Sequence, residues 1–315
     1  EAVLQAPTVA RLAAYMDDWR RSRRPVTASP WLEIQPQGSR PRLFLVHGVG
    51  GGMLWGYANL ARHLGPDQPV YAFKACAPDR LEEFDTVEKM AAYYVQELRH
   101  FQPEGPYALG GYCFGGNVAY EMSRLLEQQG QQVSLLALMN ASPPNSSYDH
   151  VRWTPLYLAR FLHNLGHWVA GFVRWSPVKQ WRFLGWKSGS MYRKLARWLR
   201  RAQSPLTQRV VDEQVDLSHV PNDQRCLWES HVRALDRHQT RPYGGKALLL
   251  RTRGHPLHCS YDRQCGWGDL VRGGVVVRIL PGLHESLLEE PYVRVLADEL
   301  KRQLNAVPQA AMKSL

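Results

Sequence analysis

The sequence predicts an α/β fold with a mostly parallel central sheet and one long helical insertion. Two observations support this class. Seven short apolar runs, rich in leucine and β-branched residues, alternate with amphipathic segments of helical spacing. Between the fifth and sixth runs, from about 145 to 235, the chain has helical patterns and no strand pattern. Continuous apolar runs are expected of strands buried on both faces, as in parallel sheets.

The predicted elements follow in a regular order. Strands are expected near residues 31–35, 42–47, 69–74, 107–112, 133–139, 246–251 and 275–280, and helices near 86–101, 114–129 and 285–303. Inside the insertion, residues 153–166 and 191–201 have helical patterns. A chain of 315 residues that is 44% hydrophobic can bury a large core, so one main domain is expected.

The segment Y-A-L-G-G-Y-C-F-G-G-N-V-A, residues 107–119, is an apolar strand that enters a Gly-x-nucleophile-x-Gly turn and then a helix. Cys113 occupies the position at which such a turn usually carries serine. A turn this sharp leaves no room for side chains on its flanks, which explains Gly111 and Gly115. The N-terminus of the following helix stabilises a thiolate and an oxyanion. Cys113 is therefore the predicted nucleophile.

A second motif precedes this turn. Residues 41–52, P-R-L-F-L-V-H-G-V-G-G-G, form a strand that ends in a glycine-rich loop. In hydrolases built on such a sheet, this loop supplies one arm of the oxyanion hole. The backbone N–H groups of Val49 and Phe114 are the predicted donors. His47 ends the strand and is expected to brace the loop.

A third motif follows near the end of the chain. Residues 275–288, V-V-V-R-I-L-P-G-L-H-E-S-L-L, give a last strand, a turn and His284 at the start of a final helix. Histidine suits proton transfer near neutrality, so His284 is the predicted base. The three motifs, in this order, predict an α/β-hydrolase fold with a helical lid.

Four segments carry a resemblance to a known family: residues 47–64, 102–122, 265–270 and 281–291. They look like the terminal thioesterase domains of nonribosomal peptide and polyketide synthetases, over roughly residues 31–303. The resemblance implies transfer of an acyl chain from the phosphopantetheine arm of a carrier protein onto Cys113, and release to water or an internal nucleophile. It implies no bound cofactor and no metal, with an upstream peptidyl carrier domain as partner.

The cysteine nucleophile bears on the product. An acyl-thioester stays about as activated as the incoming thioester, whereas serine would give a more stable oxoester. Family members with cysteine include domains that form β-lactam rings, of the monobactam or sulfazecin type, and β-lactone rings. The resemblance implies this class without distinguishing its members. The arginine-rich insertion suggests an anionic substrate, such as an N-sulfonated peptide, which ranks β-lactam closure just above β-lactone formation and leaves macrocyclisation and hydrolysis open. An editing thioesterase and a non-catalytic interaction domain are the alternatives from other classes.

The position of the catalytic acid differs from the family pattern. Most relatives carry aspartate after the strand that follows the nucleophile, where this chain has Asn140. Asp262, after the next strand, keeps the order nucleophile, acid, histidine and is the first choice. Asn140 is the alternative, because asparagine can orient an imidazole without a charge. Asp269 and Glu285 are weaker candidates, and Asp262 could instead cap the turn that follows it.

The termini suggest a piece of a larger synthetase. Residues 6–16 resemble the closing helix of a peptidyl carrier domain, with Thr8 as N-cap. The expected division is a carrier remnant over 1–19, a basic linker over 20–30, the thioesterase domain over 31–306 with its lid at about 145–235, and a tail over 307–315.

Composition narrows the location and the partners. Five irregularly spaced cysteines suggest no disulfide framework, and no apolar run reaches the roughly 18 residues that span a bilayer. A monomer in the cytoplasm, away from membranes, is therefore expected. The cluster of His255, His258, Cys259 and Cys265 is rich in metal ligands, but its spacing matches no zinc pattern.

Much of the positive charge lies in the insertion. Residues 145–230 hold 13 Lys or Arg against 6 Asp or Glu, a net of +7 out of +11, and 7 of the 11 tryptophans. No segment resembles a nucleic-acid module, so nucleic acid is not an expected partner. The arginines are either solvated over packed tryptophans, or some face the pocket and hold an anionic acyl chain or the pantetheine phosphate.

Overall fold

The structure, a computed structural model, describes residues 30–76, 80–144, 146–173, 222–256 and 259–306, with isolated residues near the N-terminus and between 175 and 192. The predicted carrier remnant, most of the linker, the tail and nearly all of the helical pattern at 191–201 lie outside the described residues. Within the described part of the chain, no helix is long and apolar enough to cross a lipid bilayer.

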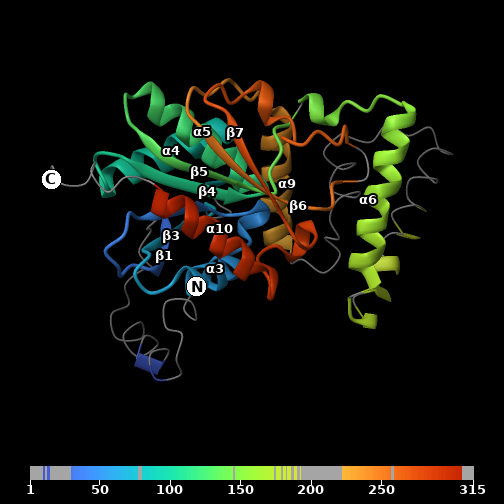
Figure 1. The fold of residues 1–315 in the computed structure, drawn as a ribbon. Helices are drawn as coiled ribbons and strands as arrows, with labels where there is room; N and C mark the ends of the chain where they lie inside the picture. The colour runs from blue at the N-terminus through green and yellow to red at the C-terminus, as the bar shows by residue number, and fades with distance from the viewer. Residues whose placement is uncertain are drawn as a thin grey trace.

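The core of the fold is a seven-stranded sheet with the order β1-β3-β2-β4-β5-β6-β7 (Figure 1). Only β1 runs antiparallel to its neighbour, and the other pairs are parallel. The strands are β1 Trp31–Gln35, β2 Leu43–Val46, β3 Val70–Phe73, β4 Tyr107–Tyr112, β5 Val133–Met139, β6 Ala247–Thr252 and β7 Val275–Leu280. The predicted fold class and all seven strands are confirmed, each strand to within one residue.

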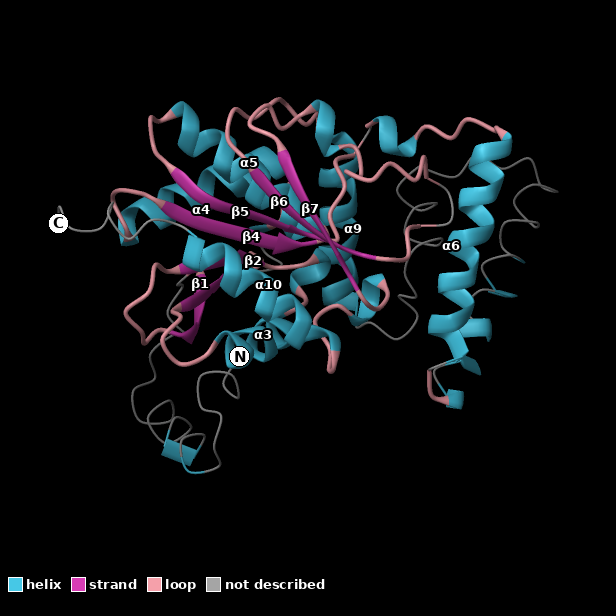
Figure 2. Ribbon diagram, in the orientation of Figure 1, coloured by secondary structure: helices cyan, strands magenta, loops and turns pink. Residues whose placement is uncertain are grey.

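Helices cover both faces of the sheet (Figure 2). The predicted helices α4, Val87–Phe101, and α5, Phe114–Gln128, pack their apolar residues on one face. The other face is covered by α3, Leu54–Leu64, and α10, Tyr292–Ala306. The sequence did not predict α3, whose short apolar stripe follows directly on a glycine-rich loop.

The final helix begins later than predicted. His284–Ser286 forms a short 3₁₀ turn, η5, and α10 starts only at Tyr292. Pro291 disfavours a helical conformation for the residue before it, so a helix cannot run continuously through that position. His284 therefore lies on a turn between β7 and α10, not in the first turn of a long helix.

Within the described part of the insertion, helix α6, Pro155–Val173, lies to one side of the sheet (Figure 1). It confirms the helical pattern at 153–166 and extends it. Helix α9, Asn222–Arg237, brings the chain back to the sheet, where it packs against the 3₁₀ turn η1, Val49–Gly51.

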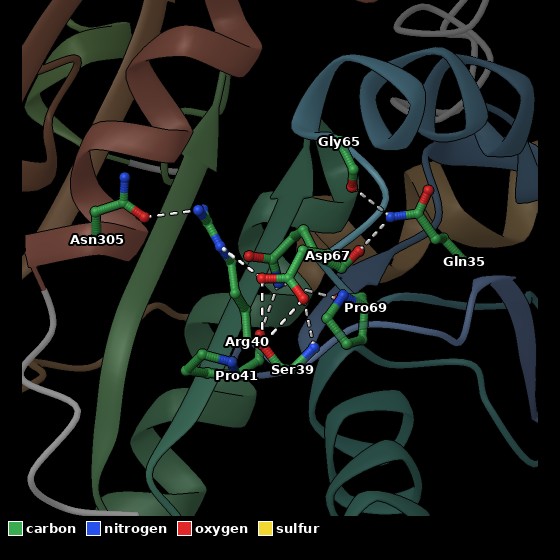
Figure 3. A network of polar contacts seen from close by, with 9 residues as sticks. Gln35, Ser39, Arg40, Pro41, Gly65, Asp67, Pro69 and Asn305 are labelled. Atoms are coloured by element: carbon green, nitrogen blue, oxygen red, sulfur yellow. Dashed lines mark hydrogen bonds and ion pairs between the residues drawn. The ribbon is translucent and has the colours of Figure 1, made fainter.

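The opposite end of the sheet is fastened by polar contacts (Figure 3). The Asp67 carboxylate accepts hydrogen bonds from the backbone N–H and hydroxyl of Ser39, at 2.8 and 2.9 Å. Arg40 pairs with Asp67 and donates to Asn305 at the end of α10. Gln35 donates to the carbonyls of Gly65 and Gln68. These contacts fix the connection between β1 and β2 far from the carboxyl edge, so they belong to the scaffold.

Candidate functional site

Cys113 stands at the turn between β4 and α5, in a backbone conformation that side chains rarely adopt. Its φ is 52° and its ψ is −114°, and it forms the N-cap of α5. Such a conformation costs on the order of 1–3 kcal/mol and persists only where the surroundings impose it. Here the Cys113 N–H donates to the Met139 carbonyl at 2.9 Å, which ties the turn to β5.

The flanking glycines are sterically required, as the sequence predicted. A Cβ atom at Gly111 would lie 2.1 Å from the Gly115 carbonyl oxygen. A Cβ atom at Gly115 would lie 2.4 Å from the Val46 carbonyl oxygen. Both obstacles are backbone atoms, which cannot move aside cheaply. The close approach of α5 to β2 and β4 therefore depends on these two glycines.

Cys113 and His284 form a hydrogen-bonded pair. Burial opposes the charged thiolate, but the charge of His284, its hydrogen bond and the Phe114 N–H together lower the pKa of Cys113. Burial likewise opposes the imidazolium, while the charge and hydrogen bond of Cys113 raise the pKa of His284. The geometry thus favours a thiolate beside an imidazolium, the reactive form of a nucleophilic cysteine.

The two backbone N–H groups predicted as oxyanion donors lie in the turn after β2 and at the start of α5. Phe114 is the first residue of α5, and its N–H lowers the pKa of Cys113 by hydrogen bonding. Val49 is the first residue of the turn η1. Among the described residues, no group accepts a hydrogen bond from its N–H. The turn is closed by bonds from Gly48 N–H to the Gly52 carbonyl and from Gly51 N–H to the Gly48 carbonyl. Both predicted oxyanion donors thus belong to ordered turns at the carboxyl edge of the sheet.

His47 braces the glycine loop. It is fully buried, and burial lowers its pKa to about 4, so it is neutral at physiological pH. Its Nδ1–H donates to the Gly48 carbonyl at 2.7 Å, and its Nε2 faces the Tyr94 hydroxyl at 2.9 Å. A buried, neutral ring with both nitrogens engaged is suited to hold a loop.

His231, on α9, contacts both arms of the candidate oxyanion hole. Its Nδ1 accepts a hydrogen bond from Gly50 N–H at 3.0 Å. Its ring stacks on Phe114, with centroids 4.6 Å apart and planes 7° apart, and on His47 at 5.0 Å. Gly50 has a φ of 66°, and a Cβ atom there would lie 2.0 Å from Trp228, also on α9. The sequence analysis missed His231, because a histidine in the insertion carries no local motif.

Two tyrosines connect the elements around the elbow. The Tyr57 hydroxyl donates to the Val46 carbonyl at 2.7 Å and accepts from Tyr112 N–H at 2.9 Å. The Tyr112 hydroxyl donates to the His284 carbonyl, and its ring lies 5.0 Å from the imidazole. Tyr57 was missed together with α3. These bonds hold the ends of β2 and β4 and the turn of His284 in one arrangement.

The structure does not bring the predicted acid to His284. Asp262 accepts a hydrogen bond from Gly266 N–H at 2.9 Å, and its charge acts on His255, where it opposes the lowering of the pKa by burial and Arg251, and not on His284. This capping contact is the structural role considered for Asp262 from the sequence. Asp269 is also engaged elsewhere, since it accepts from the Ser147 hydroxyl at 3.1 Å.

Asn140 is equally committed to another partner. Its Oδ1 accepts from the Thr252 N–H at 2.8 Å and from the Thr252 hydroxyl at 3.3 Å. Its Nδ2 is buried without a partner among the described residues. Glu285 is the carboxylate whose charge raises the pKa of His284. The site therefore presents a Cys113–His284 pair, with the charge of Glu285 as a further, smaller influence on His284.

The cysteine and histidine cluster after β6 has the features of packing and not of a reactive site. Cys259 and Cys265 are buried, and burial raises the pKa of both thiols, that of Cys265 to about 11. His258 lies outside the described residues. Among the residues that the structure describes, no group of three or more His, Cys, Asp or Glu could hold a metal ion.

The mostly parallel seven-stranded sheet and its helices match the α/β-hydrolase fold of solved thioesterase structures. Residues 41–168 match the thioesterase domain family model. The chain is 37% identical over 304 residues to a probable non-canonical nonribosomal peptide synthetase, CymA, of Salinispora arenicola, covering 96% of this chain and 4% of that protein. It is 38% identical over 142 residues to a dimodular nonribosomal peptide synthase of Bacillus subtilis, covering 45% of this chain and 6% of that protein.

Solved structures agree on the fold. One is the NocB thioesterase domain in covalent complex with a fluorophosphonate nocardicin G analogue. It superposes with a TM-score of 0.57 at 25% identity, over 87% of this chain and 99% of the NocB chain. A four-domain nonribosomal peptide synthetase, AB3403, has a TM-score of 0.60 at 24% identity, and covers 98% of this chain and 22% of that one. These findings support a thioesterase domain of the nonribosomal peptide synthetase type, and the chain spans a small part of its curated relatives.

Proposed function

We propose that this domain releases a peptidyl chain from the phosphopantetheine thioester of a carrier protein, through an acyl-cysteine intermediate on Cys113. The observation that carries this proposal is the hydrogen-bonded Cys113–His284 pair, with its lowered cysteine pKa and raised histidine pKa, at a strained elbow. Structural cysteines are usually buried with raised pKa values, as Cys259 and Cys265 are.

The proposed reaction has two steps. In the first, the Cys113 thiolate attacks the thioester carbonyl, and the pantetheine sulfur leaves with a proton from His284. In the second, a new nucleophile attacks the acyl-cysteine, His284 takes its proton, and the Cys113 thiolate is regenerated. The Val49 and Phe114 N–H groups stabilise the oxyanion of each tetrahedral intermediate. The covalent complex of the NocB domain supports a covalent route on this fold.

The product proposed first is a strained β-lactam ring, formed by an internal nitrogen nucleophile. An acyl-thioester retains the activation that a four-membered ring requires, whereas a seryl ester would lose part of it. Closure to a β-lactone, macrocyclisation and hydrolysis use the same site and are the alternatives. An upstream peptidyl carrier domain is the proposed partner, because the relatives are multidomain synthetases.

A serine variant tests the product assignment. Cys113→Ser should load the acyl chain but shift the product toward hydrolysis or a stalled ester, and Cys113→Ala should form neither. Liquid chromatography and mass spectrometry of the released products, with a synthetic peptidyl-pantetheine thioester, give the ratio. An unchanged cyclic product from Cys113→Ser would show that the cysteine is not chosen for ring closure.

The residue that acts together with Cys113 and His284, by orienting or stabilising the imidazolium, is tested separately. From the sequence, Asp262→Asn is expected to slow acylation strongly and Asn140→Ala only modestly, because a carboxylate stabilises the imidazolium. The contacts of Asp262 with Gly266 and of Asn140 with Thr252 instead favour small losses for both variants. Glu285→Gln belongs in the same series, since its charge raises the pKa of His284. Single-turnover loading rates rank the three variants. The reverse ranking would assign the orienting role to Asn140, and uniformly small losses would leave a Cys–His dyad.

An editing thioesterase and a non-catalytic interaction domain remain the alternatives from other classes. An editing enzyme would hydrolyse short acyl groups from carrier proteins as readily as the peptidyl chain. An interaction domain would bind a carrier protein without loading Cys113. Comparison of acetyl and peptidyl thioesters in the loading assay separates both from the proposed function.

A further inference from the structure

A cavity of about 830 Å³ lies between α6 and the segment that follows β6. None of its lining residues belongs to the Cys113–His284 pair. Four arginines line it, together with three histidines and a single carboxylate, that of Asp262. The arginines are Arg160, Arg251, Arg253 and Arg263.

The two walls of the cavity are fastened to each other. The Asn164 amide of α6 donates to the His255 carbonyl at 3.0 Å and accepts from His255 N–H at 2.8 Å. The Trp168 indole N–H donates to the same carbonyl at 2.8 Å. Asn164 is buried, and both its amide atoms are engaged. The position of α6 over the segment after β6 is therefore fixed by side-chain contacts before any ligand arrives.

The positive charge of the cavity is not neutralised. Among the described residues, Arg160, Arg253 and Arg263 have no carboxylate within ion-pair distance. The one carboxylate present, Asp262, already accepts from Gly266 N–H. Arg251 is buried and directs its guanidinium at the carbonyls of Thr252 and Arg253. Guanidinium groups held together without counter-charges repel one another, and an anion relieves that repulsion.

The arginines also act on His167. Burial, His163 and the arginines Arg253 and Arg251 lower the pKa of His167. The Nε2 atoms of His163 and His167 lie 3.2 Å apart, a spacing that two ligands of one metal ion could have. The surrounding arginines oppose a cation there, and favour an anion.

The cavity adjoins the turn that carries His284. Leu283, directly before His284, lies against the two elements between which the cavity is found: a Cβ atom at Gly171 of α6 would lie 2.5 Å from its side chain, and one at Gly254, after β6, would lie 3.2 Å from it. The turn that carries His284 therefore lies beside the elements that carry the arginines.

We propose that this cavity binds an oxoanion, a carboxylate, sulfonate or phosphate group, that the thioester substrate brings to the site. The planar guanidinium fork matches such groups bidentately. Two parts of the substrate could supply the anion: an acidic group on the acyl chain, or the phosphate of the carrier's pantetheine arm. That the substrate supplies the ligand rests on the proposed function. That the ligand is an anion rests on the cavity alone.

The test uses Arg160→Gln/Arg253→Gln, with Arg272→Gln as the matched control, an exposed arginine outside the cavity. Four acyl thioesters are compared: acyl chains with and without a carboxylate, each on pantetheine and on phosphopantetheine. For thioesters that carry the recognised anion, the double substitution should raise KM by about 10-fold or more. The KM for the neutral thioester, and the KM values of the Arg272→Gln control, should stay unchanged. If the two thioesters with a carboxylate respond, the anion lies on the acyl chain. If the two phosphopantetheine thioesters respond, the anion is the phosphate of the pantetheine arm. Equal effects on anionic and neutral substrates, or none, would overturn the proposal.

A second measurement does not depend on turnover. Inorganic phosphate should raise the Tm of the unmodified protein in a concentration-dependent way, and should do so less for the double variant, while Arg272→Gln behaves as the unmodified protein. A similar rise in all three proteins would overturn the site. If the unmodified protein loads no thioester, the proposed function fails, and the phosphate titration still decides whether the cavity binds an oxoanion.

Discussion

Cys113 is half-buried, and its pKa is lowered although burial opposes the charge of a thiolate. The attraction of His284 and the Phe114 N–H outweigh the cost of burying a charge. Cys265 shows the ordinary case, since burial raises its pKa to about 11. The neighbours His284 and Phe114 distinguish Cys113 from Cys265, which is also the more buried of the two.

Alkylation measures this difference directly. Iodoacetamide reacts with the thiolate, so the alkylation rate of Cys113 rises as the pH passes its pKa. In the unmodified protein we expect the midpoint below the ordinary thiol value, because the folded pKa is depressed. His284→Ala removes the attraction but leaves the burial, so the midpoint should move to higher pH. Peptide mass spectrometry separates Cys113 from the other thiols, and an unmoved midpoint would contradict the pairing.

At the scale of single residues, the sequence predicts an arrangement where the residues involved are close together in the chain. Gly111, Cys113 and Gly115 are spaced by the geometry of a single turn, so the sequence predicts their arrangement without knowledge of the rest of the fold. The orientation of Asp262 depends on the path of a long loop, and the structure shows it capping Gly266. No spacing in the sequence encodes that choice.

At the scale of elements, α9 supports both arms of the candidate oxyanion hole. His231 holds Gly50 by a hydrogen bond and Phe114 by stacking, and burial keeps its pKa well below the ordinary value. A neutral Nδ1 can accept from Gly50 N–H, and a protonated one cannot. The helix that closes the insertion thereby positions the loop and the elbow relative to each other.

Substitution of His231 tests this positioning role. His231→Ala leaves the Gly50 N–H without its acceptor, and should slow acylation by about 10- to 100-fold with little change in KM. His231→Gln, which can offer an amide oxygen, should recover part of the rate. His100→Ala, an exposed histidine of α4, is the control. Equal losses in stability and rate for both His231 variants, without rescue by glutamine, would reduce the residue to a packing role.

The elements themselves were predictable where one signal dominated. Each strand of the sheet is a continuous apolar run, and the sequence located all seven. The start of the last helix was placed too early, because Pro291 outweighs the apolar periodicity before it. Helix α3 was missed, since its contact face is formed by Tyr57, Leu60 and Leu64, a short stripe beside a glycine-rich loop.

At the scale of the whole molecule, the site is assembled from segments that are far apart in the chain. The parallel strands β2, β4 and β7 end at the same edge of the sheet, which brings the glycine loop, the elbow and the His284 turn together. The insertion adds α9 on one side and the arginine-lined cavity under α6 on another. The scaffold at the opposite edge, with Asp67 and Arg40, carries none of these groups.

The central claim is that Cys113 becomes acylated by a pantetheine thioester, and intact-protein mass spectrometry tests it most directly. The protein is mixed with a synthetic peptidyl-pantetheine thioester and quenched in acid at intervals of seconds. We expect one added acyl mass, mapped to the Cys113 peptide, absent in Cys113→Ala and formed at least 100-fold more slowly in His284→Ala. Turnover of the thioester with no acyl group ever found on Cys113, or equal acylation in Cys113→Ala, would contradict the account.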